Sequence, residues 1–200
     1  MNIKTASNDY PISNALRDRW SPRAFDGQPV SKQTLQRLFE AARWAPSASN
    51  LQPWRFIIGE KGTVTYDKIF STLVEFNKLW AVTSPLLMLA LTKMTNNKEE
   101  INNSAEYDLG QAVANLTFQA TAEGLFVHQM GGFEASEARK HFTVPDNYAI
   151  ATAIALGYLG NPDSLHENLR KMEISKRERF KADELVFTGT FGQNTQIFNQ

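Results

Sequence analysis

The amino-acid sequence predicts a single α+β or α/β domain in which helices cover a sheet. Short apolar runs alternate with longer amphipathic patterns along the chain, as expected of strands connected by helices. The 200 residues are enough for one substantial core and few for two. No repeat, low-complexity block or linker divides them. We therefore expect one domain over residues 1–200.

Composition and charge exclude several classes of protein. Lys plus Arg and Asp plus Glu number 21 each, which removes the overall attraction on which binders of nucleic acids and acidic membranes rely. The absence of cysteine excludes disulfides, thiolate nucleophiles and zinc–thiolate or iron–sulfur sites. No apolar run has the length of a signal peptide or of a membrane span. These observations predict a cytoplasmic protein with no nucleic-acid or membrane partner.

The first third of the chain predicts two helices and a strand. Residues 11–19 form a short helix that ends near two arginines. Residues 31–44 form a second helix, with Ser31 as its N-cap and apolar residues at helical spacing. Pro46 disfavours helical dihedrals at Ala45 and so ends this helix. A loop of small and amide side chains follows, and then a strand over residues 54–59.

The middle of the chain predicts a long helix, a buried strand and a loop. Residues 65–82 have Ile69, Leu73, Phe76 and Trp80 on one helical face. The unbroken apolar run 86–91 is typical of a strand covered on both sides. Residues 92–103 are polar and predict a surface loop.

The remaining elements follow the same alternation. Residues 104–123 form the longest helical pattern, with few bulky side chains and with Gly124 at the C′ position, which suits a central or dimer-facing helix. Strands are expected at 125–130 and 148–158, and helices at 134–142 and 164–173. A basic tail follows.

Two groups of basic residues stand at opposite ends of the chain. Arg17, Arg19 and Arg23 surround Ser21 near the start, and Lys176, Arg177, Arg179 and Lys181 lie near the end. Guanidinium groups bind phosphate oxygens in pairs of hydrogen bonds, whereas most charge runs are merely solvated. The loop Pro46-Ser47-Ala48-Ser49-Asn50 favours the first interpretation, because it offers backbone N–H groups and amides where core packing requires none. We predict a cradle for a planar ligand that carries a phosphate.

Other candidate sites find little support. Gly131-Gly132 follows a strand, where a backbone N–H could approach a flat ligand, although such pairs are more often turns. The three histidines lack the spacing of metal ligands, so no metal site is expected. No motif of a serine hydrolase, a P-loop or a Rossmann dinucleotide site occurs. The four tryptophans are expected to pack in the core or at an interface.

These strings resemble the flavin-dependent nitroreductases. The resemblance extends over nearly the whole chain and is carried by Arg19-Trp20-Ser21-Pro22-Arg23-Ala24-Phe25, by Ala45-Pro46-Ser47-Ala48-Ser49-Asn50-Leu51-Gln52-Pro53-Trp54, by Gly131-Gly132-Phe133 and by Arg177-x-Arg179. It implies a central, mostly antiparallel sheet flanked by helices. It also implies an intertwined homodimer with two FMN molecules at the subunit interface.

The resemblance assigns a role to individual residues. Arg19, Ser21 and Arg23 would hold the phosphate and ribityl end or the pyrimidine edge, and Arg177 and Arg179 would complete the phosphate site. Trp20 would contribute through its backbone, since the family often has a basic or small polar residue there. Pro46, Ser47, Ala48 and Asn50 of the partner chain would line the isoalloxazine ring. Asn77 would meet the polar edge of the flavin, and the segment Met130, Gly131 and Gly132 would reach flavin N5 through a backbone N–H.

The implied activity is ping-pong reduction of electron-poor small molecules, such as nitroaromatics and quinones, with NADH or NADPH as a transient hydride donor. FMN would carry out the redox chemistry, which agrees with the lack of a catalytic triad in the sequence. Two alternatives stay open: a relative that acts on halogenated, azo or oxygen acceptors, and a flavin-binding protein with a storage or regulatory role. Residues 96–103 or the surroundings of Phe133 are expected to form the lid over the flavin.

Overall fold

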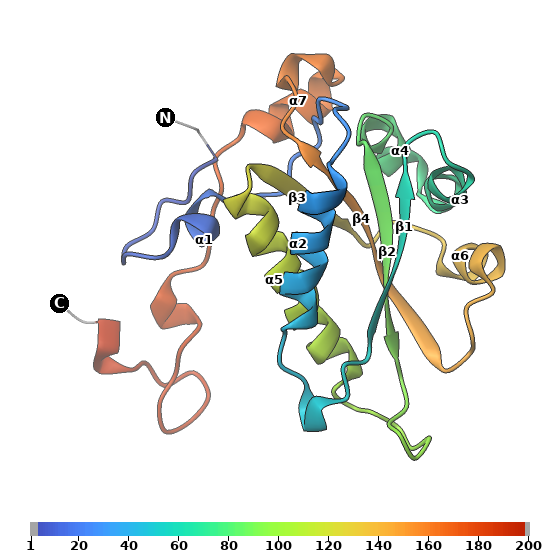
Figure 1. Cartoon of the computed structure of the whole chain (residues 1–200). Coiled ribbons are helices and arrows are strands. Elements are labelled where there is room, and N and C mark those ends of the chain that lie inside the picture. Colours follow the sequence, from blue (N-terminus) through green and yellow to red (C-terminus); the bar gives the residue numbers. More distant parts are fainter. Residues whose placement is uncertain (1–3, 199–200) are drawn as a thin grey trace.

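The computed structural model describes residues 4–198 and shows one four-stranded antiparallel sheet with helices on both faces (Figure 1). The strand order is β1-β2-β4-β3, so β3 is an edge strand. The strands are β1 (Trp54–Glu60), β2 (Leu86–Lys93), β3 (Leu125–Met130) and β4 (Tyr148–Tyr158). The α-helices are α1 (Asn14–Asp18), α2 (Lys32–Arg43), α3 (Val64–Thr72), α4 (Glu75–Ala81), α5 (Ala105–Ala122), α6 (Ala135–Phe142) and α7 (Glu167–Ile174). The predicted α+β class and the antiparallel sheet are confirmed.

The sheet separates two apolar layers. On β2, side chains of odd-numbered residues such as Leu87 and Leu89 enter one layer, and those of Leu86 and Met88 enter the other. This alternation follows from the pleat of a strand that is covered on both faces. The unbroken apolar run of β2 is thereby explained, and its predicted burial is confirmed.

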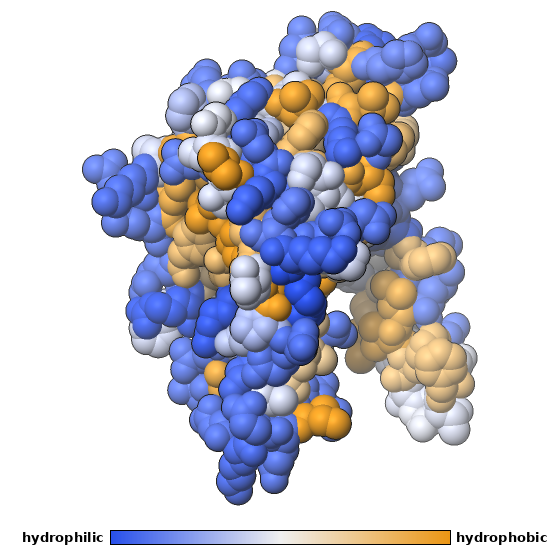
Figure 2. All heavy atoms as spheres, turned by 90° about the vertical axis from the view of Figure 1, so that its right-hand side faces the viewer, coloured by the Kyte–Doolittle hydropathy of each residue, from blue (hydrophilic) through white to orange (hydrophobic). Residues whose placement is uncertain are grey.

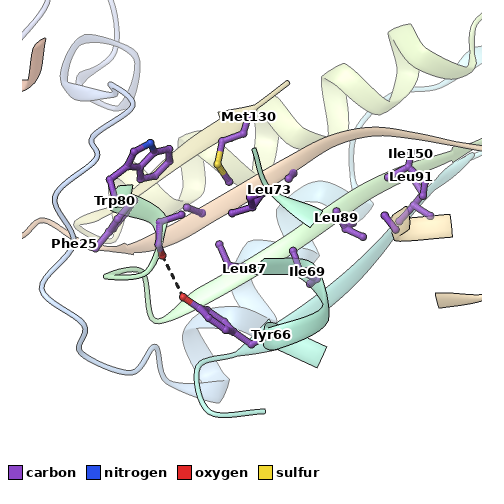
Figure 3. Packing of buried hydrophobic residues seen from close by; sticks show 14 of the residues in the cluster. Phe25, Tyr66, Ile69, Leu73, Trp80, Leu87, Leu89, Leu91, Met130 and Ile150 are labelled. Atoms are coloured by element: carbon purple, nitrogen blue, oxygen red, sulfur yellow. Dashed lines mark hydrogen bonds between the residues drawn. The ribbon is translucent and has the colours of Figure 1, made fainter. Parts of the chain in front are cut away.

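The helices divide between these two layers. α2 and α5 pack on one face of the sheet, and α3, α4 and α6 lie at the other (Figure 1). In the second layer, Tyr66, Leu73, Trp80 and Met130 converge on the sheet (Figure 3). The Tyr66 hydroxyl lies 3.2 Å from the Ala81 carbonyl and 3.0 Å from the Ser84 carbonyl, and these two acceptors share its single proton. Burial raises the pKa of Tyr66 to about 12, so this hydroxyl keeps its proton and remains a donor.

Helix α2 forms where the sequence predicts it. The Ser31 hydroxyl accepts a hydrogen bond from the Thr34 amide at 3.1 Å, which satisfies one of the free N–H groups of the first turn. The helix ends at Arg43, three residues before Pro46. Helix α5 also matches its prediction, and Gly124 follows it with a φ of 78°.

The single helix predicted over residues 65–82 is wrong. The chain breaks between α3 and α4, where Leu73 is extended and forms an isolated bridge with Phe133. Backbone bonds fix the break, because the Val74 amide donates to the Gly132 carbonyl and the Glu134 amide donates to that of Thr72. A tertiary contact with the segment after β3 therefore overrides the helical periodicity. As a consequence, Phe76 is 49% exposed instead of buried.

Three further boundaries differ from the prediction. Strand β2 continues to Lys93, so the expected loop is shorter. Within this extension, Thr92 is buried and donates its hydroxyl to the Ala105 carbonyl. Beyond it, Thr95 and Ile101 pair as an isolated bridge. Helix α1 begins only at Asn14. The predicted helix 164–173 is a short 3-10 turn over Pro162–Ser164 followed by α7.

Apolar side chains are exposed on several parts of the surface, and two of these parts are relevant to the site. Val64, Phe76 and Leu79 are exposed on α3 and α4, and Figure 2 shows that apolar atoms alternate with polar ones on this face. The C-terminal segment after α7 runs along the side of the molecule that also carries the N-terminal segment (Figure 1). In it, Phe180 and Phe191 are 74% and 95% exposed. Within residues 4–198, no helix is both long enough and apolar enough to span a membrane.

Candidate functional site

The first arginine string lies beside the edge strand β3. The Trp20 ring meets Phe126 edge to face at a centroid distance of 6.0 Å. Two residues further along both segments, the Pro22 carbonyl lies 2.8 Å from Nδ1 of His128. A carbonyl only accepts hydrogen bonds, so Nδ1 of His128 must carry the proton. These contacts align residues 20–22 with β3.

His128 is held neutral by its surroundings. Burial lowers its pKa to about 4, although the hydrogen bond to Pro22 acts in the opposite direction. Its ring lies 4.4 Å from that of Trp80, which is fully buried. His128 therefore anchors the arginine string to the sheet and carries no charge at neutral pH.

Arginines from both ends of the chain converge. Burial lowers the pKa of Arg19, and the positive charge of Arg179 lowers it further. The pKa of Arg177 is lowered by burial and then by Arg19 and Arg179. Within residues 4–198, no carboxylate forms an ion pair with any of these three guanidinium groups. The three side chains thus concentrate uncompensated positive charge, as an anion site requires.

Arg23, Ser21 and Trp20 differ in their exposure. Arg23 is half-buried, and its Nε finds no hydrogen-bond partner among the residues that the structure describes. The Ser21 hydroxyl is exposed and lies 3.5 Å from Nη1 of Arg19. The Trp20 side chain is buried, as expected of a packing residue, which leaves its backbone as the part that could meet a ligand.

Neighbouring residues orient part of this arginine set. Arg17 forms a two-bonded ion pair with Asp18 at 2.9 and 3.0 Å, which fixes the orientation of its guanidinium group. Arg177 donates through Nη1 to the carbonyls of Lys4 and Arg17 at 2.8 and 3.3 Å. The tail is thereby joined to the N-terminal segment. Arg179 remains exposed, with one bond to the Glu178 carbonyl.

A second group of predicted residues surrounds the end of β3. The Asn77 side chain is buried and donates from Nδ2 to the Gly132 carbonyl at 2.9 Å. A Cβ on Gly132 would lie 2.8 Å from both this Nδ2 and Cγ2 of Val74, so close packing requires glycine here. Gly131 is exposed and has open space where a Cβ would lie. The Met130 side chain belongs to the core, so only its backbone is available.

The loop over residues 46–52 is exposed and strained. Ser49, Asn50 and Gln52 have φ values of 49°, 54° and 48°, a left-handed conformation that side chains other than glycine adopt at a cost. Two of the hydrogen bonds that hold it go from backbone amides to side chains. The Gln52 amide donates to the Ser47 hydroxyl at 3.1 Å, and the Ala48 amide donates to the buried carboxylate of Asp108 on α5, also at 3.1 Å.

Within one chain, this loop does not meet the arginines. The loop follows the C-terminal end of α2, whereas the arginine string lies beyond the N-terminal end (Figure 1). The twelve residues of α2 alone have a length of about 18 Å. One chain therefore brings the arginines together near β3, and it brings Asn77 to Gly132. The loop residues Pro46, Ser47, Ala48 and Asn50 stay far from the arginines. The predicted cradle is not formed within a single chain.

Sequence reasoning missed three residues that hold these segments: His128, Asp108 and Glu173. Glu173 accepts bonds from the amides of Arg23 and Ala24 at 2.8 and 3.0 Å. A buried acid on an otherwise apolar helical face is a signal that the sequence contains, and Asp108 is such a case, because it lies one turn from Ala105 and from Ala112. For Glu173 and His128, the partner lies more than 100 residues away and leaves no local signal.

Comparison with known proteins identifies the family. The model of the Nitroreductase family matches residues 16–74 and 67–158. The chain belongs to the nitroreductase family. The match includes the first arginine string, the loop after α2 and the glycines after β3, whereas Arg177 and Arg179 lie outside it.

The chain is also similar to individual proteins and solved structures. A crystal structure described as an oxidoreductase containing FMN superposes with a TM-score of 0.89 at 31% identity, over 97% of this chain and 98% of that one. An uncharacterised 15.4 kDa protein of Mycolicibacterium smegmatis is 32% identical over 146 residues, which cover 69% of this nitroreductase-family chain and 97% of the relative. Nitrobenzene nitroreductase of Ectopseudomonas oleovorans is 48% identical over 44 residues, 22% of this chain and 19% of that protein.

Proposed function

We propose that this chain is an FMN-dependent oxidoreductase that takes hydride from NADH or NADPH and reduces electron-poor small molecules such as nitroaromatics and quinones. The observation that carries the proposal is the convergence of Arg19, Arg177 and Arg179 without a carboxylate partner among residues 4–198. Three such guanidinium groups repel one another. A phosphate dianion bound between them would attract all three and offset this repulsion. The FMN of the related structure supports this choice of ligand.

The residues present fit FMN in three respects. Arg19, Arg177 and Arg179 provide the charge for its phosphate. Arg23 is partially buried, and its Nε, which has no hydrogen-bond partner in the described part of the chain, provides a donor for the polar groups of FMN. Gly131 directly follows the edge strand β3 and offers an exposed backbone next to open space. It lies three residues after His128, the residue of β3 that binds the arginine string through Pro22. Three residues of strand correspond to about 10 Å, which suits an extended ligand with a phosphate at one end and a ring system at the other.

The proposed active unit is a homodimer. The loop over residues 46–50 lies at the far end of α2 from the arginines of its own chain, so a second copy would have to bring Pro46, Ser47, Ala48 and Asn50 to the flavin ring. The exposed apolar tail supports such an assembly, because Phe180 and Phe191 have too little contact with their own chain to be buried. Each of the two sites would then contain residues from both subunits.

When bound, FMN supplies the hydride chemistry, and the chain supplies position and charge. The arginines would fix the phosphate end. The backbone N–H at Gly131 or Gly132 would donate towards N5, and the hydrogen bond from Asn77 to the Gly132 carbonyl holds that backbone still. Positive charge and backbone donors near the ring would stabilise the negative charge that develops on reduction.

Purification of the full chain with added FMN tests the proposal. We expect a yellow dimer, with an FMN absorbance that bleaches when NADH or NADPH is added without oxygen. The colour should return on addition of an acceptor from a panel of nitroaromatic, quinone, azo and halogenated compounds and oxygen. Failure to take up FMN would contradict the proposal. Tight FMN binding without bleaching by either nicotinamide would instead indicate a storage or regulatory role.

A further inference from the structure

Glu173 is a buried acid that connects the two ends of the chain. It lies near the end of α7, is 2% exposed, and accepts through Oε1 from the backbone amides of Arg23 and Ala24 at 2.8 and 3.0 Å. The two partners lie about 150 residues earlier in the sequence. One oxygen atom of α7 thus fixes the backbone of the first arginine string.

Cations surround this carboxylate. The Lys4 ammonium is buried, lies 5.2 Å from the centre of the Trp20 ring and donates to the Met172 carbonyl at 3.1 Å. Burial lowers the pKa of Lys4, and the charge of Glu173 acts against that effect. Burial likewise lowers the pKa of Arg23, again opposed by Glu173. The carboxylate therefore stabilises the charged forms of both neighbours.

Helix α7 also sets the start of the second arginine segment. Arg177 follows Glu173 after four residues, and its side chain binds the carbonyl of Lys4. A displacement of α7 relative to residue 23 would therefore move both arginine segments relative to each other. Because a charge-assisted hydrogen bond depends steeply on distance and angle, such a displacement would weaken a shared phosphate site.

We propose that Glu173 is a positioning residue that keeps the two arginine segments in register for the phosphate of FMN. This inference rests on the function proposed above. The negative charge of Glu173 would itself repel a nearby phosphate, so we assign its contribution to phosphate binding to the hydrogen bonds that fix residues 23 and 24. Only Oε1 makes these bonds, since Oε2 has no hydrogen-bond partner among the described residues. A neutral amide oxygen at the same place could replace it.

The test compares the dissociation constants of FMN and riboflavin, which differ only by the phosphate. For Glu173→Ala we expect the preference for FMN over riboflavin to fall about tenfold, the equivalent of one to two lost hydrogen bonds. Glu173→Gln should keep the preference within about threefold of the wild type, because its amide oxygen can still accept both bonds. Glu167→Gln is the matched control, as Glu167 is exposed on the same helix and pairs with Lys171 on the surface.

Each outcome decides the matter. Equal weakening of FMN and riboflavin in Glu173→Ala would show a merely structural role and overturn the inference. Tighter FMN binding in that variant would show that charge, and not position, governs the site, and would overturn it as well. If Glu173→Ala does not fold, Glu173→Asp replaces it, because the shorter side chain cannot reach both amides. An unchanged preference for FMN over riboflavin in Glu173→Asp would contradict the inference. A wild-type chain that binds neither flavin would instead refute the proposed function.

Discussion

The two halves of the candidate site are held in opposite ways. The loop over residues 46–52 takes its shape from nearby residues, with one long-range bond to Asp108. The arginine half joins residues 19–23 to residues 173–179 through bonds that cross about 150 positions of the sequence. The loop half contains backbone strain, whereas the arginine half contains electrostatic repulsion. Strain and repulsion each raise the free energy of the chain without ligand, which is typical of binding sites.

This difference separates what each half can recognise. A strained loop of small residues offers shape and backbone donors, which suit an uncharged ring. A set of guanidinium groups offers charge, which suits a phosphate. Substitutions in the arginine half should therefore discriminate between FMN and riboflavin, and those in the loop half should affect both flavins alike.

The largest effect is expected from Arg19→Gln. Loss of its charge removes charge-assisted bonds worth about 2 kcal/mol, so the dissociation constant of FMN should rise about 30-fold. Riboflavin binding should change less than about threefold, because it lacks the phosphate. Fluorescence titration with both flavins measures this. Arg170→Gln is the control, since Arg170 is exposed and pairs with Asp163 on the surface. An equal loss for both flavins would contradict the phosphate role of Arg19.

The next effect concerns the pH dependence of stability. The pKa of His128 is about 4 in the folded chain and 6.5 in the unfolded one, so between these values the unfolded state binds more protons. Stability must therefore decrease as pH falls through this window. We expect the free energy of unfolding to be about 2 kcal/mol lower at pH 5 than at pH 7 on account of His128. Denaturant unfolding at both pH values measures it.

Two substitutions isolate this contribution. His128→Gln should remove this contribution, so the free energy of unfolding of the variant should change less between pH 7 and pH 5. At pH 7 the variant should be less stable than the wild type. His141→Gln should leave it in place, because His141 is exposed on α6. A wild-type difference that persists in His128→Gln would assign the acid sensitivity to other groups.

A smaller effect is expected from Asp108→Ala on the loop half. The substitution removes the acceptor of the Ala48 amide, which should cost about 1 kcal/mol of stability and weaken FMN and riboflavin by the same factor of about five. Parallel titrations with both flavins measure this. Glu106→Ala, an exposed acid on the same helix, provides the comparison. A loss confined to FMN would show that the loop, too, responds to the phosphate.

The smallest effect is expected from Ser49→Gly. Glycine adopts a φ of 49° without strain but loses more entropy on folding, so we expect a net stabilisation of about 0.5 kcal/mol. Thermal unfolding measures it, with Ser7→Gly as a control outside the loop. Destabilisation instead would show that the entropy cost of glycine exceeds the strain of the left-handed conformation at this position.

Local patterns in the sequence were sufficient for most of the fold. Ser31 and Pro46 fixed the ends of α2 because capping and proline geometry act within a few residues. The apolar run of β2 indicated a strand buried on both faces. The break between α3 and α4 was not predictable in this way, since the bonds of Thr72 and Val74 to the segment after β3 cause it.

For the site, the sequence by itself determined the chemical types: arginines at both ends, a loop of small polar residues between prolines, and a pair of glycines after a strand. Only the tertiary structure decided which of these meet. It brought Arg19 close enough to Arg179 for their charges to interact, and it placed the loop at the other end of α2. The physical reason is that helices and turns depend on neighbouring residues, whereas a binding site depends on contacts such as that of Glu173 with Arg23, which exist only once the chain has folded.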